Sequence, residues 1–446
     1  MKKVITYGTY DLLHQGHINL LRRAKALGDY LIVGVTSDSF DKGRGKLNVR
    51  NNVLERVESV KATGYADEVI IEDYLGQKID DILRYGVDIF AIGSDWIGKF
   101  DYLNEYCQVV YLPRTEGVSS TQLRAASQSI VRIGVVGSGR IAKRFVPETD
   151  VVDGACVTTV LNPDEEEARR FANEFGIEPS CKYESFLERV DAVYIASPHL
   201  SHYFYAKGAL LAGKHVLCEI PMTLSGKEAR ELYKLAEDND LVLLEANKTA
   251  FCPAFGHVVT LVKSGIVGDV VDVRASLSKV VAAPTRELDV TQGGGAMNEH
   301  ASLTLLPVVK LLGKDFNNIQ FYSKMGDGVD IYTKIGISYP HATSSVTLGV
   351  GVKTEGDLVI SGTKGYLYVP APWWLTDYFE VRYEDRTKNK KYFYSYDGEG
   401  LRYEIQEFIS MIINKRRGSY KMKKEESILI ADIIEQYHNG NNLTII

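Results

Sequence analysis

Short apolar runs alternate with segments of helical periodicity along the first part of the chain. The strand-like runs are Lys3–Tyr7, Tyr30–Val35, Glu68–Ile71, Val87–Ile92 and Gln108–Leu112, and the helical segments between them are Ile18–Ala26, Val53–Thr63 and Lys78–Arg84. This alternation predicts a parallel sheet with helices on its faces. Loops at the carboxyl ends of the strands are the expected functional positions.

A polar segment, residues 125–129, separates this part from a second series of alternating elements. The second series comprises Ile130–Val136, Thr158–Leu161, Asp164–Phe175, Ala192–Ala196, Phe204–Ala212, His215–Cys218 and Leu241–Glu245. Beyond about residue 265, longer alternating segments predict strands at Val270–Ser278, Ile331–Ser338 and Ser344–Val352, with helices at Leu303–Leu312, Tyr403–Ile413 and Glu425–Tyr437. The expected fold class is α/β, with domains at 1–129, 130–250 and 251–446, the last an α+β domain with a mainly antiparallel sheet.

Composition narrows the class of protein. The chain has 446 residues, of which 45% are hydrophobic and 25% charged, as in a soluble globular protein. Its 52 Lys and Arg against 58 Asp and Glu give no basic excess, so nucleic acid is not an expected partner. The five cysteines form no CxxC pair, and neither a signal-peptide core nor a membrane-spanning run is evident. We therefore expect a cytoplasmic enzyme that is not inserted in a membrane.

The turn after the first strand carries the first candidate chemistry. It reads Gly8-Thr9-Tyr10-Asp11-Leu12-Leu13-His14-Gln15-Gly16-His17 and leads into a helix. Free amides and the positive end of the helix dipole favour an anion there, and two imidazoles three residues apart can both face it. The alternative is that the histidines are helix-entry residues or a metal pair.

A second phosphate-type segment, residues 114–124 (RTEGVSSTQLR), follows the last strand of this region. Together with residues 5–29, 93–102 and 109–121, it makes residues 1–124 resemble the glycerol-3-phosphate cytidylyltransferases. The resemblance implies transfer of CMP from CTP to a polyol phosphate, with glycerol 3-phosphate as the leading acceptor and Mg²⁺ on the triphosphate. It also implies a CDP-polyol for a teichoic-acid or capsule polymer, and self-association as a homo-oligomer.

The resemblance assigns roles to individual residues. It implies that His14, His17, Lys46 and Arg114 act on the reacting phosphates, and that the nucleotide contacts Gly8, Thr9, Tyr10, Asp11, Gly16, Asp95, Trp96, Ser119, Ser120 and Thr121. The family pattern often has two acids before the tryptophan, whereas this chain has Ser94-Asp95. Lys42, Lys46 and Arg56 match basic family positions, but each taken alone is expected to be a solvated charge.

A glycine turn after residue 136 is the second candidate site. Gly137-Ser138-Gly139-Arg140-Ile141-Ala142 follows a predicted strand, and this spacing is typical of a dinucleotide-binding turn. Asn162 lies where an acid would bind the ribose 2′-hydroxyl of NAD. Because an amide does not repel a 2′-phosphate, both NAD and NADP remain open.

Further motifs make residues 131–440 similar to the Gfo/Idh/MocA oxidoreductases. They are residues 191–198 (DAVYIASP), His202, residues 213–221 (GKHVLCEIP), Glu245-Ala246 and residues 293–296 (GGGA). The resemblance implies that NAD or NADP contacts Gly137, Gly139, Arg140, Ile141, Asn162, Ser197, Pro198, His202 and Glu219.

The acid–base pair of that family is replaced. Ile220 stands where the family has a catalytic lysine, and the partner position falls on Leu303. Lys248 or His300 could replace this acid–base pair, and Asn298 and Glu299 directly precede His300. Lys248 can equally be a surface lysine, and His300 a buried structural histidine. Two hypotheses follow: a bifunctional enzyme that also reduces a sugar phosphate or related carbonyl, or a transferase whose second part only binds ligand, regulates or dimerises.

Overall fold

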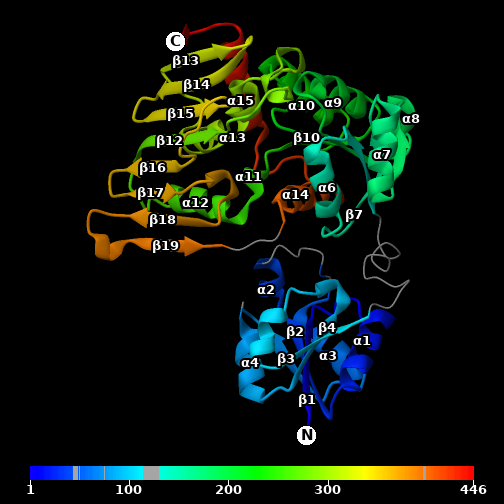
Figure 1. Ribbon diagram of the computed structural model, residues 1–446. Coiled ribbons are helices and arrows are strands. Elements are labelled where there is room, and N and C mark those ends of the chain that lie inside the picture. The colour runs from blue at the N-terminus through cyan, green and yellow to red at the C-terminus, as the bar shows by residue number, and fades with distance from the viewer. Residues whose placement is uncertain (44–48, 50, 75, 114–129, 395–397) are drawn as a thin grey trace. The chain divides into compact units, whose positions relative to one another are not determined.

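The structure, a computed structural model, describes residues 1–43, 49, 51–74, 76–113, 130–394 and 398–446. Contacts divide the chain into two compact units (Figure 1). One comprises Met1–Ile130 with Asp150–Gly154, and the other comprises Val131–Thr149 with Ala155–Ile446. Among the described helices, none is long and apolar enough to cross a membrane.

The first unit is built on a five-stranded parallel sheet of order β3-β2-β1-β4-β5. The strands are β1 (Lys3–Gly8), β2 (Tyr30–Thr36), β3 (Glu68–Glu72), β4 (Ile89–Gly93) and β5 (Gln108–Leu112). The helices are α1 (Gln15–Lys25), α2 (Asp38–Gly43), α3 (Val53–Ala62) and α4 (Gln77–Tyr85), with 3-10 turns η1 (Ser94–Trp96) and η2 (Asp101–Glu105). The order reverses between β1 and β4, and ligands bind at such a point in α/β sheets.

Two apolar cores cover the two faces of this sheet. Leu21 of α1 and Val60 of α3 pack with Val33 on one face, while Ile82 of α4 packs with Phe90 on the other. This agrees with the sequence pattern, because α1, α3 and α4 each present an apolar face and the central strands β1, β2 and β4 are buried on both sides.

The second unit begins with a six-stranded parallel sheet of order β11-β10-β9-β6-β7-β8. Its strands are β6 (Val131–Val136), β7 (Ala155–Leu161), β8 (Glu178–Ser180), β9 (Ala192–Ile195), β10 (His215–Glu219) and β11 (Leu243–Ala246). Its helices are α6 (Arg140–Thr149), α7 (Glu165–Phe175), α8 (Tyr183–Leu187), α9 (His202–Leu211) and α10 (Gly226–Asp238). The strand order reverses between β6 and β9, so their loops open a crevice at the carboxyl edge.

A nine-stranded mixed sheet of order β19-β18-β17-β16-β12-β15-β14-β13-β20 follows. Its strands are β12 (Val270–Ser278), β13 (Asn318–Gly326), β14 (Val329–Ser338), β15 (Thr343–Gly349), β16 (Leu358–Gly362), β17 (Tyr366–Val369), β18 (Tyr378–Arg382), β19 (Lys390–Phe393) and β20 (Leu443–Ile445). All neighbouring pairs are antiparallel except β12 with β15 and β13 with β20. The predicted fold class, two parallel Rossmann-like sheets and a mainly antiparallel one, is confirmed.

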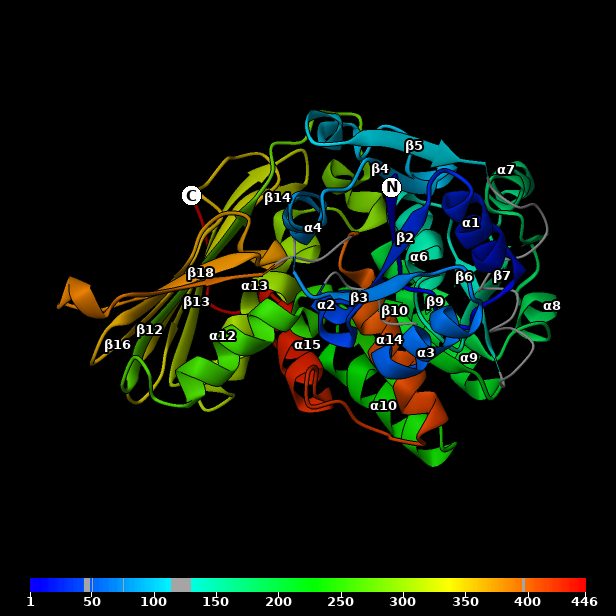
Figure 2. The same cartoon turned by 90° about the horizontal axis from the view of Figure 1, so that it is seen from below.

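Helices join the two sheets of the second unit. They are α11 (Lys248–Phe251), α12 (Pro253–Lys263), α13 (Ala296–Leu312), α14 (Leu401–Ile413) and α15 (Lys424–His438), of which α12, α13 and α15 lie between the two sheets (Figures 1 and 2). Arg402 of α14 donates to Glu148 of α6 at 2.6 Å, and Arg230 of α10 donates to Asp432 of α15. The chain end thus packs back on the six-stranded sheet, and the predicted boundary at residue 250 stays a prediction.

Candidate functional site

The turn between β1 and α1 holds the paired histidines. His14 is the N-cap of α1, and its Nδ1 accepts a hydrogen bond from the Gly16 N–H at 3.1 Å. Because that nitrogen accepts, a neutral His14 ring carries its proton on Nε2. The His14 and His17 rings stack with centroids 3.9 Å apart and an interplanar angle of 21°. The structure therefore brings the two predicted imidazoles together at a helix start.

The backbone before the histidines is held in an unusual conformation. Tyr10 and Leu12 have φ angles of 54° and 46°, in the left-handed region that non-glycine residues rarely adopt. Tyr10 is 1% exposed, and its ring packs edge-on to His17 with centroids 5.5 Å apart. Buried packing of this ring fixes the strained turn, and strain of this kind clusters at functional sites.

Arg56 holds the same turn in place through hydrogen bonds to backbone carbonyl oxygens. Its side chain is fully buried and donates to the carbonyl oxygens of Thr9 at 2.8 Å and Asn51 at 3.0 Å. It also pairs with Asp38 at 2.6 Å and Asp41 at 3.5 Å. The expectation of a solvated charge at position 56 is therefore wrong, because tertiary packing encloses the guanidinium. Its geometry is that of a positioning residue.

Asp11 completes the attachment of the turn. It is 3% exposed, and its Oδ1 accepts from the Asn51 N–H at 3.0 Å. Beside it lies a cavity of about 600 Å³, lined by Tyr10, Leu12, Leu13, Asn51, Arg56, Ser59 and Ala62.

The other predicted residues of this site are either exposed or lie outside the described residues. Asp95 and Trp96 lie in η1 at the carboxyl end of β4 and are exposed, with Trp96 43% exposed and 5.7 Å from the Phe100 ring. Lys46, Arg114, Ser119, Ser120 and Thr121 lie outside the described residues. In the described part of the chain, no group of three or more His, Cys, Asp or Glu side chains could hold a metal ion.

Sequence reasoning missed Lys78 at the start of α4. It forms an ion pair with the buried Glu72, and its ammonium lies 4.6 Å from the centroid of the Tyr7 ring. Tyr7 in turn donates to Asp81 at 2.8 Å. A cation thus lies at the carboxyl edge of the sheet, yet no motif marks this lysine, because its partners come from separate strands and helices.

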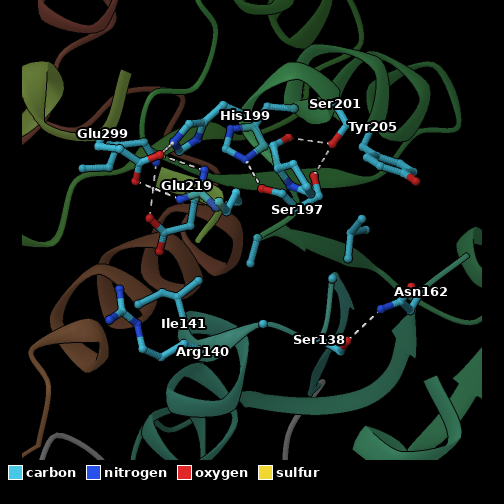
Figure 3. A pocket seen from close by; sticks show the side chains of 18 of the residues that line it. Ser138, Arg140, Ile141, Asn162, Ser197, His199, Ser201, Tyr205, Glu219 and Glu299 are labelled. Atoms are coloured by element: carbon cyan, nitrogen blue, oxygen red, sulfur yellow. Dashed lines mark hydrogen bonds and ion pairs between the residues drawn. The ribbon is translucent and has the colours of Figure 1, made fainter. Parts of the chain in front are cut away.

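The glycine turn after β6 opens the second site. Gly137 has a φ of 98°, and a Cβ there would lie 2.6 Å from the carbonyl oxygen of Ala196. A Cβ on Gly139 would meet no protein atom within 4 Å. Asn162 donates through its side-chain amide to Ser138 Oγ at 2.7 Å. The predicted turn and Asn162 therefore lie side by side (Figure 3).

A cavity of about 760 Å³ extends from this turn. It is lined by Val136, Gly137, Ser138, Gly139, Arg140, Ile141, Asn162, Pro163, Ala196, Ser197, Pro198, His199, Ser201, His202, Tyr205, Glu219, Ile220, Arg286, Glu287 and Glu299. Figure 3 shows Ser138 and Asn162 toward one end, and His199, Glu219 and Glu299 toward the other. All nine residues predicted to contact NAD or NADP line this cavity.

His202 joins two loops at the edge of the cavity. Its Nδ1 lies 2.8 Å from the carbonyl oxygen of Pro221, and its Nε2 lies 2.8 Å from that of Ser197. Burial lowers the pKa of His202 to about 4, although the two carbonyl oxygens favour the charged ring, so the ring is neutral at neutral pH and donates to one of the two oxygens. It holds the loops after β9 and β10 together and is suited to shaping the cavity.

Glu219 is an acid of perturbed ionisation in the same wall. Burial raises its pKa to about 7, although the Tyr194 hydroxyl, the Ile220 N–H and Lys248 favour the carboxylate. Tyr194 donates to it at 2.5 Å. The fully buried Glu404 lies close enough for the two acids to disfavour each other's charge, since Glu219 also raises the pKa of Glu404 beyond the effect of burial.

The predicted substitutes for the acid–base pair separate in the structure. Lys248 does not line the cavity and donates to the carbonyl oxygen of Glu399 at 3.2 Å. His300 does not line it either, and burial lowers its pKa to about 4. Asn298 binds the carbonyl oxygens of the glycine run, whereas Glu299 does line the cavity. Ile220 lines it too, so the wall lacks an amine at that position.

Comparison with known proteins agrees with these geometries for the first unit. A family model described as cytidylyltransferase-like matches residues 5–126. The glycerol-3-phosphate cytidylyltransferase of Bacillus spizizenii is 50% identical over 135 residues, which is 29% of this chain and 100% of that protein. The enzyme of the same name from Staphylococcus aureus is 49% identical over 124 residues, which is 28% of this chain and 93% of that protein. The chain belongs to the cytidylyltransferase-like family.

The rest of the chain matches a different family. A family model described as an oxidoreductase family with an NAD-binding Rossmann fold (Gfo/Idh/MocA) matches residues 131–246. Trans-1,2-dihydrobenzene-1,2-diol dehydrogenase of Oryctolagus cuniculus is 28% identical over 324 residues, covering 70% of this chain and 98% of that protein. The structure of KijD10, a 3-ketoreductase from Actinomadura kijaniata in complex with NADP and TDP-benzene, has a TM-score of 0.64 at 22% identity over 71% of this chain and 99% of that one. This cytidylyltransferase-like enzyme therefore carries a fused Gfo/Idh/MocA oxidoreductase domain.

Proposed function

We propose that the first unit transfers CMP from CTP to a polyol phosphate, with glycerol 3-phosphate as the leading acceptor. The observation that carries the proposal is the stacked pair His14 and His17 at the start of α1, in a chain half identical to glycerol-3-phosphate cytidylyltransferases over this region. An acceptor phosphate oxygen attacks the α-phosphorus of CTP, the bond to the β-phosphate breaks, and pyrophosphate leaves. The product, a CDP-polyol, is a suitable donor for a teichoic-acid or capsule polymer.

The described side chains have distinct tasks in this reaction. His14 Nε2 and His17 donate to the oxygens on which charge develops, and the first amides of α1 add to the same field. Arg56 and Asp11 keep the turn in place through the Thr9 carbonyl and the Asn51 amide. Lys78, at the same edge of the sheet, supplies a cation for the phosphate of the acceptor. We propose that Lys46, Arg114 and residues 119–121 bind the oxygens of the triphosphate.

Magnesium fits this site only as a companion of the triphosphate. Asp38 and Asp41 are paired with Arg56, and the described residues provide no ready cluster of acidic ligands. A Mg²⁺ ion bound with the triphosphate would take most of its ligands from phosphate oxygens and water, as in many nucleotide sites. The protein's own part is to position the reactants.

Pyrophosphate release tests the transferase proposal. The full-length protein is incubated with CTP, Mg²⁺ and, in separate reactions, glycerol 3-phosphate, ribitol 5-phosphate or no acceptor. We expect release that depends on an acceptor and is greatest with glycerol 3-phosphate. Release with none of the acceptors would refute the function, and greater release with ribitol 5-phosphate would refute only the choice of acceptor.

For the second unit, we infer binding of NAD or NADP across the glycine turn. The open space at Gly139, where a Cβ would meet no protein atom, gives a pyrophosphate room to approach the start of α6. Asn162 and Ser138 are neutral partners for a ribose hydroxyl or a 2′-phosphate. Titration of the protein into NADH and NADPH, followed by nucleotide fluorescence, tests this inference, and unchanged fluorescence and no heat of binding for both would contradict it.

A further inference from the structure

Three charged side chains meet in the cavity wall where the family lysine is replaced. His199 Nε2 lies 2.9 Å from Glu299 Oε1. Arg286 donates to Glu299 Oε2 at 2.8 Å and forms an ion pair with Oε1 at 2.8 Å. All three line the cavity that also contains Ile220. The His199 and Glu299 side chains are each 9% exposed, whereas that of Arg286 is 32% exposed, so the His199–Glu299 pair is enclosed and the guanidinium is partly solvated.

The glycine run brings these residues together. A Cβ on Gly294 would lie 2.7 Å from the carbonyl oxygens of Arg286 and Glu287, and one on Gly293 would lie 3.1 Å from the Leu200 side chain. Glycines here let the 286–289 segment and the loop after β9 approach the start of α13. Glu299, one turn before Leu303 on this helix, then projects between His199 and Arg286 (Figure 3 shows Glu299 beside His199).

We propose that His199 is the proton donor of an active reductase in this second unit, with Glu299 and Arg286 as its positioning residues. As substrate class we infer a ketose or aldose phosphate, because this is the carbonyl form of the polyol phosphate proposed as acceptor for the first unit. The proposal rests on the dinucleotide binding proposed above and goes beyond it, because it assigns catalysis to a cavity without the usual lysine.

The hydrogen bonds leave one nitrogen of the ring for this task. Nε2 is held by Glu299, whereas Nδ1 is buried without a hydrogen-bond partner in the described part of the chain. A substrate carbonyl oxygen at Nδ1 would provide that partner. Leaving a buried polar atom without a hydrogen bond costs free energy. The unpaired Nδ1 of His199, in a ring held by Glu299, is therefore better suited to binding a ligand than to packing alone.

The proton balance is simple. When bound, a reduced nicotinamide supplies the hydride that the carbonyl carbon receives. Protonated His199 gives its Nδ1 proton to the carbonyl oxygen, which becomes the product hydroxyl, and the ring is left neutral with its remaining proton on Nε2 toward Glu299. In the oxidation direction, neutral His199 takes the hydroxyl proton at Nδ1.

The surrounding charges support a ring that changes protonation. Burial by itself raises the pKa of Glu299, but His199 and Arg286 lower it to about 2, so Glu299 stays a carboxylate and stabilises an imidazolium. Arg286 opposes that charge, and Glu287, which also lines the cavity, favours it. His202, edge-on to His199 with centroids 5.5 Å apart, is neutral.

The test separates binding from catalysis in the full-length protein. Wild type, H199Q, E299Q and the control H341Q, which replaces an exposed imidazole of the same unit, are compared. Dissociation constants for NADH and NADPH come from fluorescence titration, and turnover comes from cofactor oxidation with dihydroxyacetone phosphate, ribulose 5-phosphate, fructose 6-phosphate and glyceraldehyde 3-phosphate.

We expect wild type and H341Q to reduce at least one of these compounds. H199Q should lose about 10²- to 10⁴-fold in kcat while its dinucleotide dissociation constant changes by less than about threefold. E299Q should shift the pH profile of reduction toward lower pH, because its imidazolium has lost a stabilising carboxylate. A merely structural ion cluster would not move that profile.

Several outcomes would overturn the proposal. They are no turnover by wild type with any of the four compounds, H199Q turnover within about threefold of wild type, or activity lost in K248M or H300Q but kept in H199Q. If the wild-type protein binds neither NADH nor NADPH, the dinucleotide-binding proposal is overturned, and the His199 proposal that rests on it falls as well.

Discussion

Replacement of Arg56 by methionine should destabilise the first unit strongly. Methionine keeps much of the apolar stem but cannot donate to the Thr9 and Asn51 carbonyls, and it removes the cation beside Asp38. Breaking a buried ion pair on one side costs about 3–5 kcal/mol. Each buried acceptor left unpaired adds about 1–3 kcal/mol before any rearrangement. We therefore expect a loss of about 3–5 kcal/mol, since solvent reaching the half-exposed Asp38 offsets part of the total.

Calorimetry of the full-length protein measures this loss. For a unit of this size, about 1 kcal/mol corresponds to roughly 4 °C, so the first transition of R56M should fall by about 10–20 °C while the transition of the second unit stays in place. The matched control is R22M, which removes an exposed guanidinium from α1 and should shift the transition by at most about 2 °C. If the first transition of R56M lies within about 2 °C of wild type, the buried Arg56 does not stabilise the first unit as reasoned here.

Three further changes probe the two sites. H17A should keep both thermal transitions but lose at least about 10²-fold in pyrophosphate release, because one donor to the developing charge is missing, and near-normal release would contradict that role. G137A should weaken dinucleotide binding at least about fivefold through strain of about 1–3 kcal/mol at a φ of 98°, and an unchanged dissociation constant would speak against the turn. Glu299 has a pKa lowered from 4.5 to about 2, so it stabilises the fold above pH 4.5 and loses this effect as the pH falls toward 2. The stability difference between wild type and E299Q should therefore shrink by up to about 2 kcal/mol between pH 6 and pH 3, and a constant difference would contradict the ion cluster.

Local patterns predicted most of the architecture. Strands β1, β2, β4 and β6 begin and end within two residues of their predicted bounds, because buried parallel strands are continuous apolar runs. Helix α13 begins at Ala296, seven residues before its predicted start at Leu303, since its first turns carry the polar Asn298, Glu299 and His300. Those residues are held by tertiary partners that periodicity does not show.

The sites were predictable where one continuous segment builds them. The turn from Gly8 to His17 and the turn from Gly137 to Ala142 each lie on a strand–loop–helix unit, so motif and geometry coincide. His199, Arg286 and Glu299 come from three separate segments, and only the approach allowed by Gly293 and Gly294 joins them. Lys248 and His300 follow the family motifs closely in the sequence, but their side chains do not line the cavity.

The identity of the nucleotide product decides whether the first unit is a cytidylyltransferase. Full-length protein is incubated with CTP, Mg²⁺ and glycerol 3-phosphate, and the nucleotide products are separated and identified by mass spectrometry alongside pyrophosphate. We predict CDP-glycerol and pyrophosphate in equal amounts, both greatly reduced with H17A. Pyrophosphate formed together with CMP rather than CDP-glycerol, or no conversion of CTP at all, would contradict it.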